Sequence, residues 1–321
     1  MGKTIAITGA TGFAGRHAVT ELLGQGHQLK ALVRSPGTAA LPAAVETVKG
    51  DLDDSVALDR LLDGADAVLH LAGAITSPDR HGYFRVNAHG TVAVAEAASR
   101  HGTARFVHIS SLSAREPGLS PYGASKRAGE DAIATLMDKL NAVIIRPPAV
   151  YGPGDRGTLP LIKELTQAVA VIPGPRAARF SLIHVRDLAR IIVKAVGGTE
   201  RGIHEVSDGR VGGYGWADLI KVAGEMRGSA IRAIFLPRAI PLAVALGAEA
   251  LSRFTAKPGM VNRGKVAELY HLDWVCRVGT LTLADATGFA EGFAETVNWY
   301  REAGWLPPAA RADRTSQISR T

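Results

Sequence analysis

A tyrosine and a lysine four residues apart, with two serines shortly before them, are the side chains best suited to chemistry in this chain. Tyr122 and Lys126 fall on one face of a predicted helix, because residues i and i+4 are neighbours on a helix surface. Ser110 and Ser111 follow a strand-like run whose carboxyl end would face a ligand crevice in a parallel sheet. A phenol, an ammonium and a hydroxyl so arranged suit hydride transfer to or from a carbonyl.

In this arrangement Tyr122 is the expected general acid and base, and Ser111 is expected to orient the substrate oxygen. The pKa of a phenol in water is near 10, which is too high for a base at neutral pH. We therefore expect the Lys126 ammonium, together with the cationic ring of an oxidised nicotinamide, to lower the pKa of Tyr122. An ordinary surface pair on a helix is the alternative interpretation of the same spacing.

A motif near the N-terminus is typical of a phosphate-binding loop. Gly9, Gly12 and Gly15 recur at intervals of three, between a strand-like run and an apolar helical pattern. Such glycines permit a tight turn, a close approach of backbone N–H groups to a pyrophosphate, and close packing of the helix on the strand. The positive end of the helix dipole would stabilise the anion, with Thr11 and Phe13 also in contact with the cofactor. A plain structural turn is the alternative.

The residue at the end of the second strand-like run bears on which cofactor is bound. Arg34 lies nineteen positions after Gly15. An acid near that position bonds the ribose 2′-hydroxyl of NAD, whereas an arginine accommodates the 2′-phosphate of NADP. Arg16, in the first helical turn, could also reach that phosphate. The sequence therefore favours NADP(H), with NAD(H) as the alternative and a solvated strand-end charge as the simplest interpretation of Arg34.

The elements that must position these residues alternate between two periodicities. Short apolar runs alternate with helical patterns through the first half, which predicts βαβ units and a parallel sheet. The predicted fold class is α/β, a Rossmann-type doubly wound parallel sheet with a smaller, mostly helical C-terminal substrate lobe. The expected strands are Lys3–Thr8, Gln28–Val33, Val45–Val48, Asp66–Leu71, Arg105–Ile109 and Ala142–Arg146, and the expected helices are Phe13–Leu23, Ser55–Leu62, Tyr83–Arg100 and Tyr122–Leu140.

The regular alternation of strand-like and helical patterns ends at a cluster of prolines and glycines at 147–154. We expect a dinucleotide-binding domain over 1–157, to which 181–207 returns, a substrate lobe over 158–308 and a disordered tail over 309–321. The second half is predicted to contain one strand, Phe180–His184, and the helices Leu159–Val169, Asp187–Val196, Trp216–Met226, Arg238–Phe254, Arg263–His271 and Glu291–Ala303.

Composition excludes several classes of protein. Hydrophobic residues make up 46% of the chain and charged residues 21%, as in an ordinary globular protein. A single cysteine, Cys276, rules out an intrachain disulfide and a Cys-based zinc module, and no His/Asp/Glu cluster has metal-ligand spacing, so no metal is expected. No apolar run reaches the roughly 18 residues of a membrane span, and no signal peptide is evident. The expected location is cytoplasmic.

The net charge of +7 is concentrated in the second half of the chain. Residues 161–321 hold 21 basic and 15 acidic residues, a net charge of +6. No stretch of five Lys or Arg residues indicates a nucleic-acid site, so we expect a small-molecule substrate and no nucleic-acid partner. The excess in the substrate lobe is the one feature of composition that favours an anionic substrate over a hydrophobic one.

Taken together, these motifs resemble those of the extended short-chain dehydrogenase/reductases, in the epimerase/dehydratase-like superfamily. The resemblance runs from Lys3 to Leu306. It implies that Ser111, Tyr122 and Lys126 are a catalytic triad and that Asn87 braces the active site. It also implies a homodimer formed through the helices that match Tyr83–Arg100 and Tyr122–Leu140.

The resemblance extends to further cofactor contacts. Gly50-Asp51-Leu52 resembles the family's adenine-contacting segment, although Asp51 could instead begin a turn before a helix capped by Asp54. His70-Leu71-Ala72-Gly73 resembles the turn beside the cofactor, and the segment from Arg146 to Gly154 resembles the one that leads to the substrate lobe. The residues implied at the cofactor are therefore Asp51, Leu52, Leu71, Ala72, Gly73 and Pro147, with Tyr122 and Lys126.

Departures from the family pattern bear on the reaction. Sugar dehydratases carry an acidic pair after the catalytic hydroxyl residue, where this chain has Leu112-Ser113. Sugar epimerases place an asparagine where Ala149 stands, and often an arginine where Phe180 stands, with Arg179 one place off. The Pro147-Pro148-Ala149 motif and the apolar stretch after Pro237 more closely resemble the hydroxysteroid dehydrogenase and ketone reductase branches.

The leading hypothesis is an NADP(H)-dependent oxidoreductase that acts on a hydrophobic alcohol or ketone. A nucleotide-sugar epimerase with tightly bound NAD is the first alternative. A non-catalytic NADP(H)-binding subunit or sensor is the second.

Overall fold

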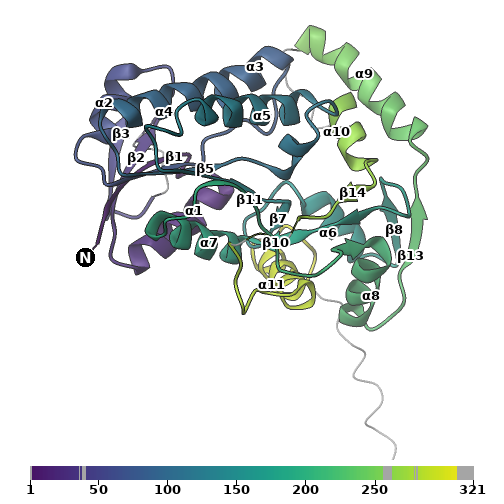
Figure 1. The fold of residues 1–321 in the computed structure, drawn as a ribbon. Helices are drawn as coiled ribbons and strands as arrows, with labels where there is room; N and C mark the ends of the chain where they lie inside the picture. The colour runs from purple at the N-terminus through teal and green to yellow at the C-terminus, as the bar shows by residue number, and fades with distance from the viewer. Residues whose placement is uncertain are drawn as a thin grey trace, which may run out of the picture.

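A seven-stranded sheet, in which every strand runs parallel to its neighbours, forms the largest part of the molecule (Figure 1). The computed structural model describes residues 2–35, 37, 41–255, 262–277, 279 and 281–308, and only the backbone of 250–255. The sheet has the order β11-β6-β5-β4-β1-β2-β3, so the order reverses beside β1, where dinucleotides bind in such folds. Its strands are β1 (Thr4–Thr8), β2 (Gln28–Val33), β3 (Val45–Lys49), β4 (Ala67–His70), β5 (Arg105–Ile109), β6 (Ala142–Arg146) and β11 (Gly202–Glu205).

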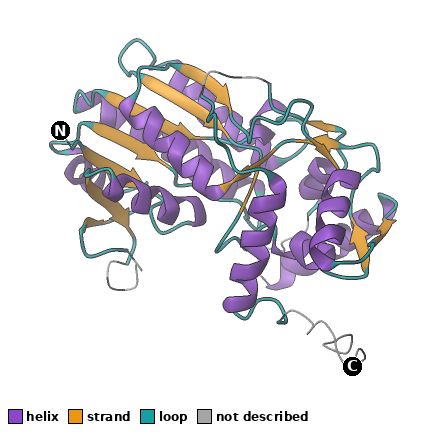
Figure 2. Ribbon diagram, turned by 90° about the horizontal axis from the view of Figure 1, so that it is seen from below, coloured by secondary structure: helices purple, strands orange, loops and turns teal. Residues whose placement is uncertain are grey.

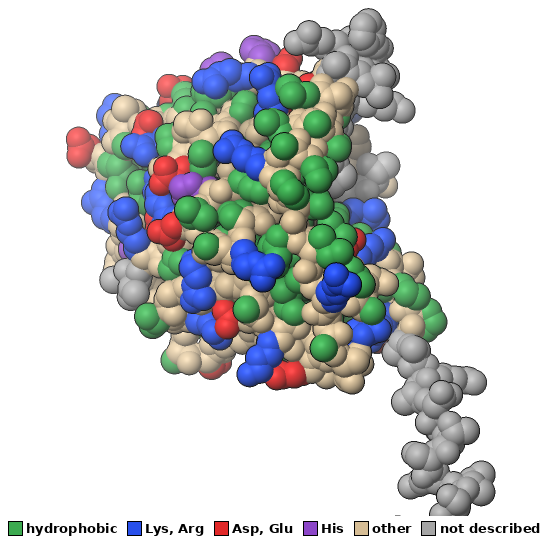
Figure 3. All heavy atoms as spheres, turned by 90° about the vertical axis from the view of Figure 1, so that its right-hand side faces the viewer, with side chains coloured by type: hydrophobic (Ala, Val, Ile, Leu, Met, Phe, Trp, Pro, Cys, Tyr) green, Lys and Arg blue, Asp and Glu red, His purple; other side chains and the backbone are tan. Residues whose placement is uncertain are grey.

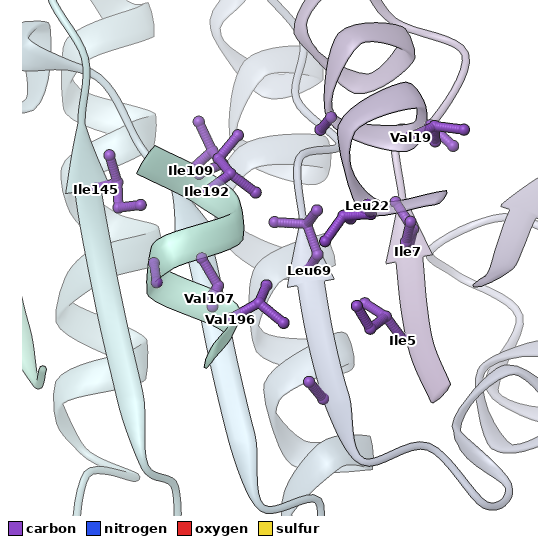
Figure 4. Packing of buried hydrophobic residues seen from close by; sticks show 14 of the residues in the cluster. Ile5, Ile7, Val19, Leu22, Leu69, Val107, Ile109, Ile145, Ile192 and Val196 are labelled. Carbon is purple, nitrogen blue, oxygen red and sulfur yellow. The ribbon is translucent and has the colours of Figure 1, made fainter. Parts of the chain in front are cut away.

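Helices cover both faces of this sheet, which confirms the predicted α/β, Rossmann-type class. Helices α1 (Phe13–Gly24) and α7 (Val185–Gly197) cover one face, and α2 (Ser55–Leu62), α4 (Gly90–Arg100) and α5 (Pro121–Ala134) cover the other (Figure 1). Figure 4 shows the first of these interfaces, where strand side chains such as Ile7 and Leu69 meet Leu22 of α1. Each fully buried side chain of this size contributes roughly 1.5–3 kcal/mol, so this packing fixes the sheet that carries the site.

Two helices beside the sheet differ from their predicted extents. The helix expected over Tyr83–Arg100 is three consecutive pieces, α3 (Arg80–Phe84), a π-helical turn η2 (Arg85–His89) and α4. The π turn contains Asn87, whose side chain is buried. Such turns occur frequently at functional sites. Helix α5 ends at Ala134 rather than Leu140, because the chain must turn back into β6.

The other differences between the predicted and the observed elements involve short strands. Helix α6 (Leu159–Leu165) ends before Val169, which instead begins β8 (Val169–Ile172) and pairs with β13 (Arg232–Phe235). The single strand expected over Phe180–His184 is two strands in different sheets, because a break after Phe180 sends each to its own partners. These are β9 (Arg179–Phe180), which pairs with β12 (Tyr214–Gly215) and β14 (Asp273–Trp274), and β10 (Leu182–His184), which pairs with β7 (Ala149–Tyr151).

The C-terminal part is mostly helical and has its own aromatic core. Figure 2 shows its helices beside the end of the sheet. The core includes Trp216, Phe289, Phe293 and Tyr300, and the remaining helices are α8 (Trp216–Arg227), α9 (Ala239–Thr255), α10 (Arg263–Leu269) and α11 (Phe289–Glu302). Strand β11 lies within the segment 181–207 and pairs with β6 at the edge of the main sheet. The domain limits stay a prediction, and the tail expected over 309–321 lies outside the described residues.

Candidate active site

The glycine loop between β1 and α1 has the backbone geometry of an anion site. Gly9 has φ +78°, and a Cβ there would lie 2.5 Å from the Ala72 nitrogen. A Cβ on Gly15 would lie 2.1 Å from the Gly9 carbonyl oxygen, so each of these two positions needs glycine. Gly12 is the N-cap of α1 and has no side chain to cap it. The first N–H groups of α1 are thus left to a ligand, which fits a pyrophosphate.

The other predicted loop residues lie around this helix start. The Arg16 Nε donates a hydrogen bond of 3.0 Å to the Thr11 carbonyl, so its side chain lies along the loop. Phe13 is half-buried and its ring meets the His17 ring edge-on. Arg34 directly follows β2 and is exposed. The position of Arg34 at the carboxyl edge of the sheet is therefore as expected from the sequence.

Asp51 and Leu52 form the turn between β3 and α2. The Asp51 carboxylate accepts the Asp53 N–H at 3.0 Å, and the Asp54 carboxylate caps α2 by accepting the Ala57 N–H at 2.9 Å. Leu52 is half-buried against Gly90 of α4. The turn-forming role considered for Asp51 is therefore present, and its contact with an adenine ring stays a prediction.

The turn after β4 lies between the glycine loop and the predicted catalytic lysine. His70 is fully buried and lies between the Thr8 and Thr91 hydroxyls, at 2.6 and 3.0 Å. Burial lowers the pKa of His70 to about 3, so this histidine is neutral and structural. A Cβ on Gly73 would lie 3.7 Å from the Lys126 Nζ. Leu71, Ala72 and Gly73 thus connect the loop at Gly9 with Lys126.

Helix α5 carries the predicted catalytic pair. Ser120 caps it by accepting the Gly123 N–H at 2.9 Å, and Pro121 follows in the first turn. Tyr122 is half-buried, whereas the Lys126 side chain is buried and donates a hydrogen bond of 2.7 Å to the carbonyl of Ile109, the last residue of β5. The helix cap and this bond together fix the pair against the carboxyl end of the sheet.

The two serines after β5 have different partners. The Ser110 hydroxyl is buried and donates to the Glu130 carboxylate at 2.5 Å. The Ser111 hydroxyl accepts the Ser113 N–H at 3.2 Å and lies near enough to the Tyr122 phenol to act on its pKa. The Pro147 carbonyl accepts the Leu112 N–H at 2.8 Å, which holds the turn after Ser111 against the end of β6. Ser111, Tyr122 and Lys126 are therefore brought together, and Ser110 belongs to the core.

The pKa of Tyr122 departs in the direction opposite to our expectation. Burial raises it to about 12, with smaller contributions in the same direction from Glu268 and Tyr83, while the Ser111 hydroxyl opposes the shift. Burial also lowers the pKa of Lys126 to about 8, against an opposing contribution from Glu130. The expected lowering of the pKa of Tyr122 by Lys126 is not found for the chain itself, where loss of water around the phenol raises the pKa and the opposing influence comes from Ser111.

Asn87 braces the segment beside the pair through both atoms of its amide. Its Oδ1 accepts the Ala74 N–H at 2.7 Å, and its Nδ2 donates to the Ala74 carbonyl at 3.0 Å and to the Ser125 hydroxyl at 2.9 Å. The side chain of Asn87 therefore ties the chain after Gly73 to helix α5.

Sequence reasoning missed two residues beside Tyr122. The Tyr83 ring lies 6.2 Å from the Tyr122 ring, edge to face. Glu268, on α10, accepts a hydrogen bond of 2.5 Å from the Ser120 hydroxyl at the cap of α5. A Cβ on Gly264 would lie 2.9 Å from Ser120, so α10 packs directly on the start of α5. No local spacing could reveal this contact, because Glu268 and Ser120 are 148 residues apart.

Two further observations concern other kinds of site. Within the described ranges, no group of three or more His, Cys, Asp or Glu side chains could hold a metal ion. In that same part of the chain, no helix combines the length and the apolar character needed to cross a membrane.

Comparison with known families agrees with this geometry. The model of the NAD dependent epimerase/dehydratase family matches residues 5–206, which include the glycine loop, Ser111, Tyr122 and Lys126. This chain belongs to the NAD dependent epimerase/dehydratase family. It is accordingly an NAD(P)-dependent enzyme with a Rossmann-type nucleotide-binding fold.

Individual members of the epimerase/dehydratase family differ in what they act on. The chain is 41% identical over 307 residues to a ceramide reductase of Caulobacter vibrioides, covering 94% of this chain and 96% of the relative. It is 26% identical over 246 residues to a 3 beta-hydroxysteroid dehydrogenase/Delta 5-->4-isomerase of Mycobacterium tuberculosis, covering 66% and 63%. Among solved structures, Bordetella bronchiseptica WbmH in complex with NAD+ matches with a TM-score of 0.70 and 21% identity, covering 95% and 100%, which shows the fold.

Proposed function

We propose that this enzyme reduces a hydrophobic ketone to the alcohol with NADPH, using Ser111, Tyr122 and Lys126. The observation that carries the proposal is the half-buried phenol of Tyr122, near the Ser111 hydroxyl and one helical turn before the buried Lys126. The likeness to a ceramide reductase over nearly the whole chain supports a lipid ketone as the substrate class.

The side chains then have distinct roles. The nicotinamide, when bound, supplies the hydride that reduces the carbonyl carbon. The Ser111 hydroxyl and the Tyr122 phenol hold the ketone oxygen, and the phenol gives its proton to that oxygen as negative charge develops there. A pKa near 12 keeps Tyr122 protonated at neutral pH, which is the form that reduction requires. The Lys126 ammonium, fixed by the Ile109 carbonyl, stabilises the phenolate that remains.

We propose NADP(H) rather than NAD(H) as the cofactor. Support comes from Arg34 at the end of β2, where a carboxylate would select NAD. Gly9, Gly12 and Gly15 would hold the pyrophosphate with Thr11 and Phe13. Asp51 and Leu52 would lie at the adenine, and the nicotinamide half would lie against the turn 71–73 and Pro147.

The nucleotide-sugar alternative would need a free cation for the sugar nucleotide's diphosphate. Arg179 is the residue closest to the family's arginine position, but its side chain is bonded to other residues of the lobe. Its guanidinium donates to the Gly212 and Gly213 carbonyls at 2.9 to 3.1 Å and lies 3.5 Å from the Asp218 carboxylate. The non-catalytic alternative is disfavoured because Ser111, Tyr122 and Lys126 lie together at the site.

The proposal extends to the organisation of the chain. The lobe 158–308, without 181–207, would bind the substrate, and two copies would pair through α4 and α5 as the family resemblance implies. The cytoplasmic location stays a prediction.

A ketone panel tests the proposed reaction. Purified enzyme is given NADPH or NADH with long-chain 3-oxo amides and steroid ketones in detergent micelles, and cofactor oxidation is followed by absorbance. We expect turnover with NADPH and a Tyr122→Phe variant slower by about 10²–10⁴-fold. Tyr270→Phe, which removes a phenol bonded to the Leu236 carbonyl in the lobe, serves as the control. Native mass spectrometry showing retained NAD, with no net reduction of any ketone, would instead support the epimerase.

A further inference from the structure

Helix α9 exposes an apolar face to solvent. Ile240 and Val244 are 50% and 59% exposed, and Ala243 and Gly247 share their side of the helix by the i, i+3, i+4, i+7 spacing. Leu246, beside them, is 48% exposed. We call Ile240, Ala243, Val244, Leu246 and Gly247 the α9 face.

No charged side chain interrupts the α9 face. The one charged residue within 239–249 is Glu249. Its carboxylate accepts hydrogen bonds of 2.8 Å from both the backbone N–H and the Nε of Arg263, at the start of α10. Glu249 is therefore engaged with α10, and the outward side of α9 over this range is uncharged.

The stretch of sequence that contains α9 is also strongly basic. Residues 227–268 hold seven basic residues and two acidic ones, a net charge of +5, whereas the whole lobe over 158–308 has a net charge of +4. Both acids are engaged in contacts, Glu249 with Arg263 and Glu268 with Ser120 and Lys265. Figure 3 shows Lys and Arg side chains interspersed with hydrophobic ones on the side of the molecule that carries α9. The basic residues are Arg227, Arg232, Arg238, Arg253, Lys257, Arg263 and Lys265.

We propose that the α9 face docks on an anionic lipid surface. Large exposed apolar patches mark interaction sites, and a helix of this kind lies in the membrane interface with its apolar side chains among the lipids. The exposed Arg232 and Arg238, which precede α9 in the chain, would be attracted to acidic headgroups. A second copy of the chain is a poorer occupant, because two copies of a segment with a net charge of +5 would repel one another.

Docking there would bring the lipid surface close to the catalytic helix. Glu249 joins α9 to α10, and α10 contacts the start of α5 through Gly264 and Glu268. A lipid ketone could then reach Tyr122 from the bilayer along these helices. This delivery step rests on the proposed function, whereas docking itself does not. The same geometry gives the lobe's positive charge a role that requires no anionic substrate.

Vesicle sedimentation tests the docking. The full chain is mixed with vesicles of phosphatidylcholine alone or with added phosphatidylglycerol, and the bound fraction is measured as salt is raised. We expect binding to the anionic vesicles, weakened by salt, and at least tenfold weaker binding for Ile240→Asp/Val244→Asp. Arg232→Ser and Arg238→Ser should each weaken it about fivefold. The control is Val56→Asp, at a residue that is 65% exposed on α2, and it should bind as the unmodified chain does.

The outcomes separate docking from the proposed reaction. No binding to anionic vesicles, or undiminished binding by the α9 double variant, would overturn the docking. Turnover of a short, water-soluble ketone should be the same in that double variant and in the unmodified chain, which also shows that the variant folds. Vesicle binding without reduction of any ketone would overturn the proposed function and leave the docking standing.

Discussion

Burial shifts the titration of Tyr122 and Lys126 in opposite directions, and both shifts favour the neutral form. The pKa of the phenol rises to about 12 and that of the ammonium falls to about 8. The sequence predicted these residues and Ser111, because their spacing and their place after β5 are local features. It could not predict the direction of the shift at Tyr122, since desolvation depends on how closely Tyr83 and α10 pack around the phenol.

Replacing Lys126 by methionine should stabilise the fold and abolish function. When the pKa of a lysine is lower in the folded state than in the unfolded state, keeping that lysine charged lowers the stability of the fold. That cost is fully present below pH 8, shrinks as the pH rises, and is gone above about 10.5. We expect Lys126→Met to raise the free energy of unfolding by about 1–3 kcal/mol at pH 7, measured by denaturant titration, and by much less at pH 10. Lys139→Met, at an exposed position, should change it by less than about 0.5 kcal/mol. A Lys126→Met variant less stable than the unmodified chain at pH 7 would contradict this account.

Glu268 should influence the proton affinity of Tyr122. Its carboxylate raises the pKa of the phenol, so Glu268→Gln should lower that pKa while the amide oxygen still accepts the Ser120 hydrogen bond. The reverse reaction, alcohol oxidation, needs the phenolate. Its rate at pH 9 should therefore rise a few-fold in Glu268→Gln, up to about tenfold per pKa unit. Glu225→Gln on α8, which removes a carboxylate paired with Lys221 at the surface, should leave the rate unchanged. An unchanged pH profile in Glu268→Gln would disprove the influence.

Arg34 should discriminate between the two nicotinamide cofactors. Arg34→Ala removes the proposed partner of the 2′-phosphate, and a charge-assisted hydrogen bond contributes about 1.5–3 kcal/mol. The Kd for NADPH, measured by fluorescence titration, should rise at least tenfold, while the Kd for NADH should change little. Arg60→Ala, on α2, is the matched control. Equal effects on both cofactors would show that Arg34 does not contact the phosphate.

At the scale of elements, the sheet was predictable and the short pieces were not. Parallel strands buried on both faces appear in a sequence as apolar runs, and β2, β5 and β6 lie where those runs predicted them. Strands β9 and β12 have two residues each, too few for any alternation to be detected. The π turn at Asn87 was hidden because its bonds are to Ala74 and Ser125, outside the helix.

Two glycine substitutions in helix interiors should have opposite effects on stability. A Cβ on Gly129 of α5 would lie 2.4 Å from the Asn87 carbonyl oxygen in the π turn, whereas one on Gly247 of α9 would meet nothing within 4 Å. We expect Gly129→Ala to destabilise the chain by about 1–3 kcal/mol through overpacking. Gly247→Ala should stabilise it by about 0.5–1 kcal/mol through helix propensity. Thermal denaturation checks both, and a neutral Gly129→Ala would show that α5 does not pack as described.

At the scale of the whole molecule, the distribution of charge takes on a different meaning. The sequence located an excess of +6 in the second half of the chain and could only connect it with an anionic substrate. The structure shows Arg179 bonded within the lobe, while the net excess of the lobe falls on the sequence segment 227–268, which contains the exposed α9 face. The family and the fold were predictable from motifs, but this surface depends on which side of α9 remains uncovered.

The central claim is hydride transfer to a lipid ketone with protonation by Tyr122, and isotope transfer tests it most directly. The enzyme is given NADPH carrying deuterium at the transferable C4 position and a long-chain 3-oxo amide, and the product is examined by mass spectrometry. We predict one deuterium on the carbinol carbon of the alcohol, and formation of this product about 10²–10⁴-fold more slowly by Tyr122→Phe. An unlabelled alcohol, or labelled alcohol formed as fast by Tyr122→Phe as by the unmodified enzyme, would contradict the account.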